Sequence, residues 1–139
     1  MEVEELKKII ETSSYINFGN FGQGVDNNII TTAENKLNFT FPEEYKIWLK
    51  NYSGGEINGE EILGIFNSNF EVWPNTVFAN LKMRKDAFIT NNELAIQMND
   101  QAEIYFFKKN DDKVYLKWGN IEELYADSFF DFIVKKSSE

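Results

Sequence analysis

The spacing of apolar residues along this chain changes from a helical period in the first part to alternation in the last third. Apolar and charged residues recur at helical spacing from Glu2 to Glu11, which predicts an amphipathic helix. The clearest helix begins at Pro42, and its apolar residues lie at i, i+3, i+4 and i+7: Tyr45, Trp48, Leu49 and Tyr52. Gly54-Gly55 is predicted to supply the left-handed residue that ends this helix.

Three further helices are predicted from their capping residues. Thr31 and Glu34 match a capping box, so a helix is predicted to begin at Thr31. Another is predicted to extend from Asn75, as the cap, to Lys85. Its helical spacing is predicted to group four residues on one side: Val77, Phe78, Leu81 and Lys82. Asp127 is predicted to cap the last helix, with inward residues Phe129, Phe132 and Ile133.

The remaining segments predict a loop and several strands. Glycine and asparagine between Ser13 and Asn28 predict a long loop. Residues 60–66 are predicted to form a strand that pairs with residues 56–58. The strand-like runs that follow predict an antiparallel meander with a short edge strand, and they span 94–98, 102–107, 113–118 and 121–125. The predicted class is therefore α+β, with an antiparallel sheet of about four to six strands packed against N-terminal, central and C-terminal helices in one domain over residues 1–139.

The composition excludes several kinds of chemistry. The chain has no cysteine and no histidine, which removes the common catalytic triads, thiolate chemistry and the usual transition-metal sites. No cofactor is expected. The charged start and the absence of a long apolar run predict neither a signal peptide nor a membrane span, so a cytoplasmic protein is expected.

The distribution of charge points to a partner with a basic surface. The net charge of −9 argues against direct binding of nucleic acid, which requires clustered lysine and arginine. No lysine or arginine occurs between Asn51 and Leu81 or between Asp86 and Phe107. Six acidic residues from these two segments are predicted to form one partner-binding surface: Glu56, Glu60, Glu61, Glu71, Asp100 and Glu103. Trp73, which precedes Pro74, is a candidate contact residue, although burial is the commoner situation for tryptophan.

Carboxylates are the remaining candidates for catalysis. Asp100 with Glu103, or Asp111 with Asp112, could form an acid–base pair or hold a hard cation. Both pairs fall on predicted hairpin turns, where carboxylates ordinarily support the local backbone. The structural explanation is therefore favoured, and an enzyme that uses Asp100 and Glu103 stays open as a third hypothesis.

Several segments resemble the SUKH superfamily. The first runs from Ile30-Thr-Thr-Ala-Glu-Asn-Lys-Leu37 through Phe41-Pro-Glu-Glu-Tyr-Lys-Ile-Trp-Leu49 to Asn51-Tyr-Ser-Gly-Gly55, and the later ones include Lys113-Val-Tyr-Leu-Lys-Trp118 and Ala126-Asp-Ser-Phe-Phe-Asp-Phe132. The likeness covers about 30–136. Phe41 stands where leucine is usual, and Ser53 lies between Asn51 and the glycines.

The resemblance implies a function in protein binding. The superfamily includes fungal regulators of cell-wall assembly and bacterial immunity proteins that bind and block polymorphic toxins, often nucleases. It therefore implies an intracellular immunity protein that occludes a cognate toxin, here through an acidic surface. A regulatory interaction module that binds no toxin is the alternative. The sequence predicts neither the partner's identity nor the oligomeric state.

Overall fold

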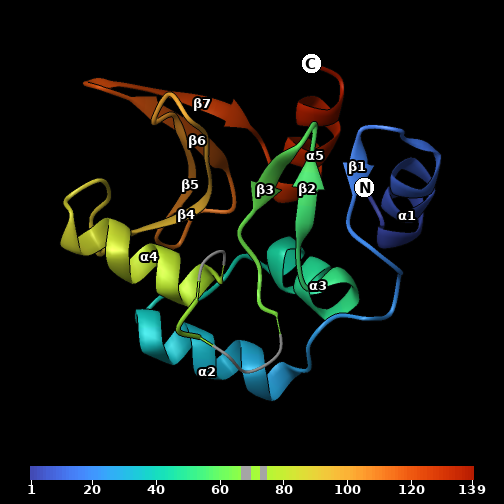
Figure 1. Cartoon of the computed structure of the whole chain (residues 1–139), viewed down its shortest axis with the longest axis horizontal. Helices are drawn as coiled ribbons and strands as arrows, with labels where there is room; N and C mark the ends of the chain where they lie inside the picture. The colour runs from blue at the N-terminus through green and yellow to red at the C-terminus, as the bar shows by residue number, and fades with distance from the viewer. Residues whose placement is uncertain (67–69, 73–74) are drawn as a thin grey trace.

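The computed structural model of the chain describes residues 1–66, 70–72 and 75–139 (Figure 1). Its helices are α1 (Val3–Thr12), α2 (Asn27–Leu37), α3 (Glu43–Tyr52), α4 (Thr76–Lys85) and α5 (Phe129–Ser137). Its strands are β1 (Ile16–Asn17), β2 (Gly55–Ile57), β3 (Glu60–Ile62), β4 (Glu93–Met98), β5 (Ile104–Lys108), β6 (Val114–Trp118) and β7 (Ile121–Ala126). The predicted α+β class is confirmed.

The strands form two antiparallel sheets, of order β1-β2-β3 and β4-β5-β6-β7. A single sheet of about four to six strands was the expectation, and the four-stranded meander matches its predicted runs. The two sheets meet where Leu63 N donates a 2.8 Å hydrogen bond to Ile96 O. Gln97 Nε2 donates a second bond between them, to Glu60 O at 3.3 Å. These bonds fix the position of the short β2–β3 hairpin against the larger sheet.

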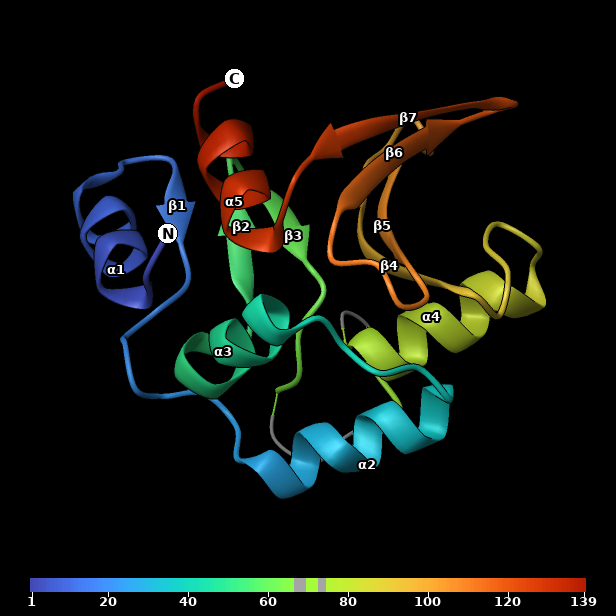
Figure 2. The same ribbon diagram turned by 180° about the vertical axis from the view of Figure 1, so that it is seen from behind.

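The main core lies between the sheets and the helices α3 and α5. The predicted inner face of α3 is confirmed, because Tyr45, Trp48, Leu49 and Tyr52 are all buried. Phe129 of α5 packs its ring against Tyr45 and Trp48 at centroid distances of 5.1 and 5.3 Å. In Figure 1, α5 lies behind the β2–β3 hairpin. In Figure 2, which shows the molecule from behind, α5 lies in front of it. The aromatic contacts hold α5 where it reaches the β2–β3 hairpin.

The predicted starts of two helices are wrong. Helix α2 begins at Asn27, because the side chain of Asp26 accepts a hydrogen bond from Ile29 N and caps the helix one turn before Thr31. Glu34 does not close a capping box; its carboxylate accepts from Phe41 N at 2.7 Å and orders the connection to α3. Helix α5 is capped by Ser128, whose hydroxyl accepts from Asp131 N, and not by Asp127.

The residue predicted to end α3 is also wrong. The left-handed residue is Ser53, with φ of 62°. A Cβ on Gly54 would meet the ring of Phe66, and a Cβ on Gly55 would overlap backbone atoms of Asn17 and Phe18. The double glycine therefore marks close packing after the helix and not the helix stop itself.

Helix α4 has its predicted bounds and cap, but the four residues grouped by helical spacing are not all buried. Asn75 caps the helix and accepts from Val77 N, as expected. Leu81 and Lys82 are exposed, and the buried positions after Val77 are Ala79, Asn80 and Met83. Asn80 is drawn inward because its side chain bonds both peptide groups of Ala95 in β4, accepting from Ala95 N at 2.6 Å and donating to Ala95 O at 3.0 Å. Strand β4 is irregular between Ala95 and Gln97, so this amide satisfies backbone groups in an interrupted ladder.

The segment predicted as a long loop, 13–28, contains the short strand β1 and the first residues of α2. Strand β1 pairs with β2 through Ile16 opposite Ile57 and Asn17 opposite Glu56. The glycines of this segment do lie in irregular backbone, where Gly19 and Gly22 have φ of 76° and 92°. The prediction is therefore correct for residues 13–15 and 18–26 and wrong for 16–17 and 27–28.

Candidate functional site

The β2–β3 hairpin presents the first group of predicted site residues. Its two-residue turn is Asn58-Gly59, with φ of 53° and 79°. Positive φ at both positions defines a type I′ turn, which suits the twist of paired strands and favours this dipeptide. The turn places Glu60 directly after it, and Glu56 and Glu61 form a cross-strand pair.

The end of helix α5 anchors the tip of this hairpin. Asn58 Nδ2 donates a 3.0 Å hydrogen bond to Lys136 O, and Asn58 N donates to Tyr15 O at 2.8 Å. Lys136 Nζ lies 3.6 Å from a carboxylate oxygen of Glu60 and 3.3 Å from Tyr105 Oη. The hairpin is thus held from the β1 side, from α5 and from the four-stranded sheet.

Lys136 retains its charge although the residue is only 5% exposed. Burial lowers the pKa of Lys136, but Tyr105, Glu60 and Glu139 raise it by more, so the net pKa lies above the ordinary lysine value. Its positive charge faces the carboxylate of Glu60. Glu60 is therefore partly neutralised within the chain, whereas no ion pair of Glu61 or Asp100 is found in the described part of the chain.

The β4–β5 turn presents the second group. Asn99 Oδ1 accepts from Gln101 N and Glu103 N, and Asn99 Nδ2 donates a 2.6 Å bond to the carboxylate of Glu103. These bonds hold the turn together and leave Asp100 exposed at its tip. Glu103 orders the turn, and Asp100 is the carboxylate that this turn offers to solvent.

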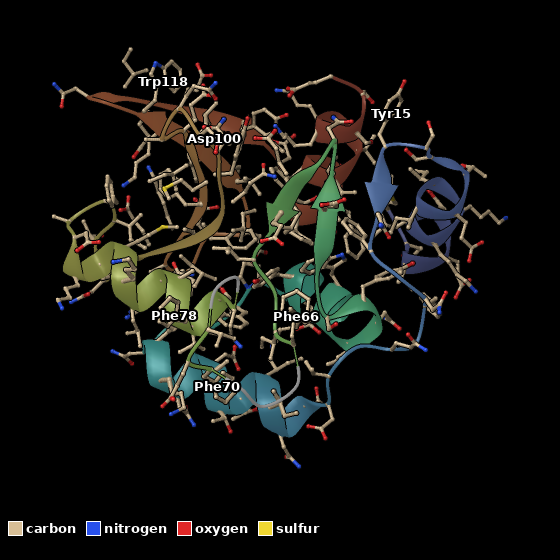
Figure 3. All side chains as sticks on the ribbon, viewed as in Figure 1. Tyr15, Phe66, Phe70, Phe78, Asp100 and Trp118 are labelled. Carbon is tan, nitrogen blue, oxygen red and sulfur yellow. The ribbon has the colours of Figure 1, made fainter. Side chains whose placement is uncertain are left out.

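The hairpin and the turn enclose a hollow of about 320 Å³, which we call the acidic hollow. It is lined by Gly59, Glu60, Glu61, Leu63, Met98, Asn99 and Asp100. Leu63 is only 1% exposed, so the half-buried Met98 supplies the apolar surface beside the carboxylates. Asp100 is seen beside the upper part of the β-sheet in Figure 3. The arrangement suits the side chain of a lysine or arginine, which has an apolar stem and a cationic head.

The cross-strand pair of Glu56 and Glu61 is unfavourable for the isolated chain. Residues directly opposite in an antiparallel pair have neighbouring side chains on the same face, and like charges there are destabilising. The partner of Glu56 in the neighbouring strand β1 is Asn17, which is uncharged. Strand β1 therefore places no positive charge opposite Glu56. The two carboxylates therefore reduce the stability of the hairpin that carries them.

We expect Glu61→Lys to raise the free energy of unfolding by about 0.5 kcal/mol, because it replaces a like-charge pair with an opposite one. Urea unfolding of the variant and the parent measures this difference. Glu123→Lys makes the same change of charge in strand β7, where the exposed Glu123 has Leu116 as its cross-strand partner, and it should leave stability unchanged. A loss of stability in Glu61→Lys would contradict the expectation.

A family model identifies the chain over almost its whole length. The model SUKH_5, described as SMI1-KNR4 cell-wall, matches residues 3–137. The chain belongs to the SUKH family. This confirms the resemblance in the sequence and extends it to the N-terminal helix.

The SUKH fold also agrees with a solved structure. A crystal structure of a protein from Pseudomonas syringae pv. tomato superimposes with a TM-score of 0.70 at 14% identity, covering 93% of each chain. At this identity the likeness concerns the fold alone. No curated protein matches the SUKH chain.

The SUKH fold brings together five of the seven predicted site residues. Glu60, Glu61 and Asp100 line the acidic hollow, Glu56 adjoins Glu61, and Glu103 supports the turn. Glu71 lies elsewhere, beside Phe78 and Lys85 on α4. Trp73 is outside the described residues. The sequence did not predict three further lining residues, Leu63, Met98 and Asn99. Alternation along the strands does not indicate that their side chains line a hollow.

One carboxylate of each candidate pair, Glu103 and Asp111, has a structural partner. Asp111 accepts from Lys113 N at 2.9 Å and from Tyr115 Oη at 2.6 Å. Burial raises the pKa of Asp111, but these hydrogen bonds and nearby lysines lower it by more, and the Asp111 carboxylate in turn raises the pKa of Tyr115 to about 12.

Within 1–66, 70–72 and 75–139, no three acidic residues lie close enough to hold a metal ion. None of the helices in these ranges has the length and apolar character of a membrane span.

Proposed function

We propose that this chain is an intracellular immunity protein that binds a protein toxin through the acidic hollow and blocks its activity. Membership of the SUKH family supports a role of this general kind. The observation that carries the proposal is the hollow itself, whose lining contains the exposed carboxylates of Glu61 and Asp100 and the half-buried Met98. A carboxylate pair that destabilises its own hairpin is readily explained if a cationic partner approaches it.

The partner is a protein with a basic surface, and a nuclease toxin fits this description. Nucleases bind phosphate groups with lysine and arginine, so their active surfaces are positively charged. In the proposed complex a basic side chain lays its stem on Met98 and directs its head to Glu61 and Asp100. Such a charge-matched contact chiefly increases the association rate and blocks nucleic acid from the same surface.

A regulatory interaction module is the second candidate. The description of the matched family model refers to the cell wall, which favours a regulatory role of the SMI1-KNR4 type. Such a module would also bind a protein without catalysis. It differs in its partner, which would not be a toxin.

The test is binding to the C-terminal domain of the protein encoded beside the gene for this chain. We expect the double variant Glu61→Lys, Asp100→Lys to associate about tenfold more slowly, with little change in dissociation rate, and to show a weaker dependence on salt. Surface plasmon resonance at low and high salt measures both rates.

The control is Asp112→Lys, Asp127→Lys, which makes the same change of charge at two exposed aspartates outside the acidic hollow. Equal association rates for the two double variants at low salt would remove the acidic hollow as the binding surface. A neighbouring protein that neither binds the chain nor is toxic in its absence would end the immunity proposal and favour the regulatory module.

A further inference from the structure

Helix α4 carries apolar residues on its outward side as well as its inward side. Val77, Ala79 and Met83 are buried, while Leu81 is 47% exposed and Phe78 is half-buried. Helical spacing groups Phe78 and Leu81 on one side of the helix, but Asn80 directs the opposite side toward β4. The outward apolar residues therefore have no covering element in the described part of the chain.

These residues border a hollow of about 550 Å³, which we call the α4 hollow. It is lined by Phe70, Glu71, Phe78, Leu81, Lys82 and Lys85. Phe70 forms one side of the hollow and packs against the main core. Lys36 Nζ of α2 lies 5.6 Å from its ring centroid. Figure 3 shows Phe70 and Phe78 over α2 and α4, at the end of the molecule away from Asp100. Contiguous exposed apolar surface of this kind marks interaction sites in soluble proteins.

The charge around the α4 hollow is opposite in sign to that of the acidic hollow. Lys82 and Lys85 line it together with one carboxylate, that of Glu71, and Lys36 of α2 lies over the ring of Phe70, so lysines outnumber carboxylates there. Lys82 forms an ion pair with Asp86 at 3.4 Å, whereas no ion pair of Lys85 is found among the described residues. In a chain of net charge −9, an acidic partner would be repelled by most of the surface and attracted at this location.

We propose that the α4 hollow binds an amphipathic helix of a partner protein, with leucine-type residues facing Phe78 and Leu81 and acidic residues facing the lysines. A helix in an apolar groove is a recurring mode of recognition, in which residues at i, i+3, i+4 and i+7 make the contact. The lysines select an acidic helix over a basic one. This site lies apart from the acidic hollow and does not depend on the toxin proposal.

The probe is a synthetic amphipathic peptide of about 16 residues, long enough for appreciable helix formation, with leucine on one face and glutamate flanking it. A matched peptide carries lysine in place of each glutamate. Titration of the ¹⁵N-labelled chain should shift the amide resonances of Phe78 and Leu81, and the lysine peptide should bind about tenfold more weakly.

Two serine variants remove similar amounts of exposed apolar surface. Leu81→Ser should weaken binding of the glutamate peptide about tenfold, whereas Leu124→Ser should not change it. The two leucines are 47% and 51% exposed, so the comparison separates the α4 hollow from general surface hydrophobicity.

The proposal is overturned if neither peptide binds at millimolar concentration, if both bind equally, or if the shifts map to β7 or the acidic hollow. It is also overturned if the two serine variants bind alike. Sedimentation of the chain without peptide tests whether a second copy covers this surface. A dimer that Leu81→Ser dissociates would identify that occupant in place of a partner helix.

Discussion

Replacing Asn80 by leucine is expected to lower the free energy of unfolding by about 3–5 kcal/mol, because it leaves buried backbone groups without partners. Asn80 is fully buried and bonds both Ala95 N and Ala95 O, and its amide also donates to Thr76 O at 2.9 Å. Leucine has a similar size but offers no donor or acceptor. Each unsatisfied buried group costs about 1–3 kcal/mol.

Urea unfolding followed by circular dichroism measures this loss for Asn80→Leu. Asn35→Leu is the matched control, since Asn35 is exposed on α2, and it should change stability by no more than about 0.5 kcal/mol. If Asn80→Leu lost less than about 1 kcal/mol, the hydrogen bonds to β4 would not be the reason that this side of α4 faces the sheet.

Gly64→Ala is expected to cost about 3 kcal/mol, at the upper end of what overpacking causes. An added Cβ would overlap Ser53 O and would lie 2.8 Å from Gly54 Cα, both of them backbone atoms. The same point is fixed by two hydrogen bonds of 2.7 Å, from Ile65 N to Ser53 O and from Thr76 N to Gly64 O. The end of α3, the exit of β3 and the start of α4 therefore meet there without room for a methyl group.

Thermal unfolding of Gly64→Ala compared with Gly119→Asn separates packing from backbone conformation. Gly119 has φ of 55° and nothing within 4 Å of an added Cβ, and asparagine tolerates that conformation. Gly119→Asn should therefore unfold close to the parent. Equal losses in the two variants would show that the contact with Ser53 is easily relieved.

The elements of this fold were largely predictable, but their capping residues were less so. The repeated aromatic spacing in α3 and the alternation in β6 identify their structures without tertiary information. Caps are harder to choose, since Thr31 with Glu34 satisfies a local motif as well as Asp26 does. The deciding contact, between Glu34 and Phe41 N, lies outside the helix and cannot be inferred from the motif.

The buried side of α4 could not be predicted for a related reason. Apolar residues lie on both of its sides, so their spacing does not select one. The choice is made by Asn80, a residue that propensity places on the surface, because the irregularity in β4 leaves peptide groups for it to bond. A polar residue thus determines which apolar residues are exposed.

The candidate site was predicted in part because its residues share a pattern of charge. Two segments without lysine or arginine, 51–81 and 86–107, contain both sides of the acidic hollow. Their convergence depends on the junction of the two sheets at Leu63 and Ile96, which is a tertiary contact. Glu71 belongs to the same pattern but follows β3 toward α4, so charge alone could not exclude it.

The anchor of the β2–β3 hairpin has a consequence for how the protein is made. Asn58 is held by the carbonyl of Lys136, 78 residues further along the chain. During synthesis the hairpin leaves the ribosome long before α5, and contacts of such sequence separation form late. The acidic hollow therefore takes its final shape only after the last helix has emerged and docked. A nascent chain would therefore gain the ability to bind a partner through this hollow only once α5 has docked, and not gradually during translation.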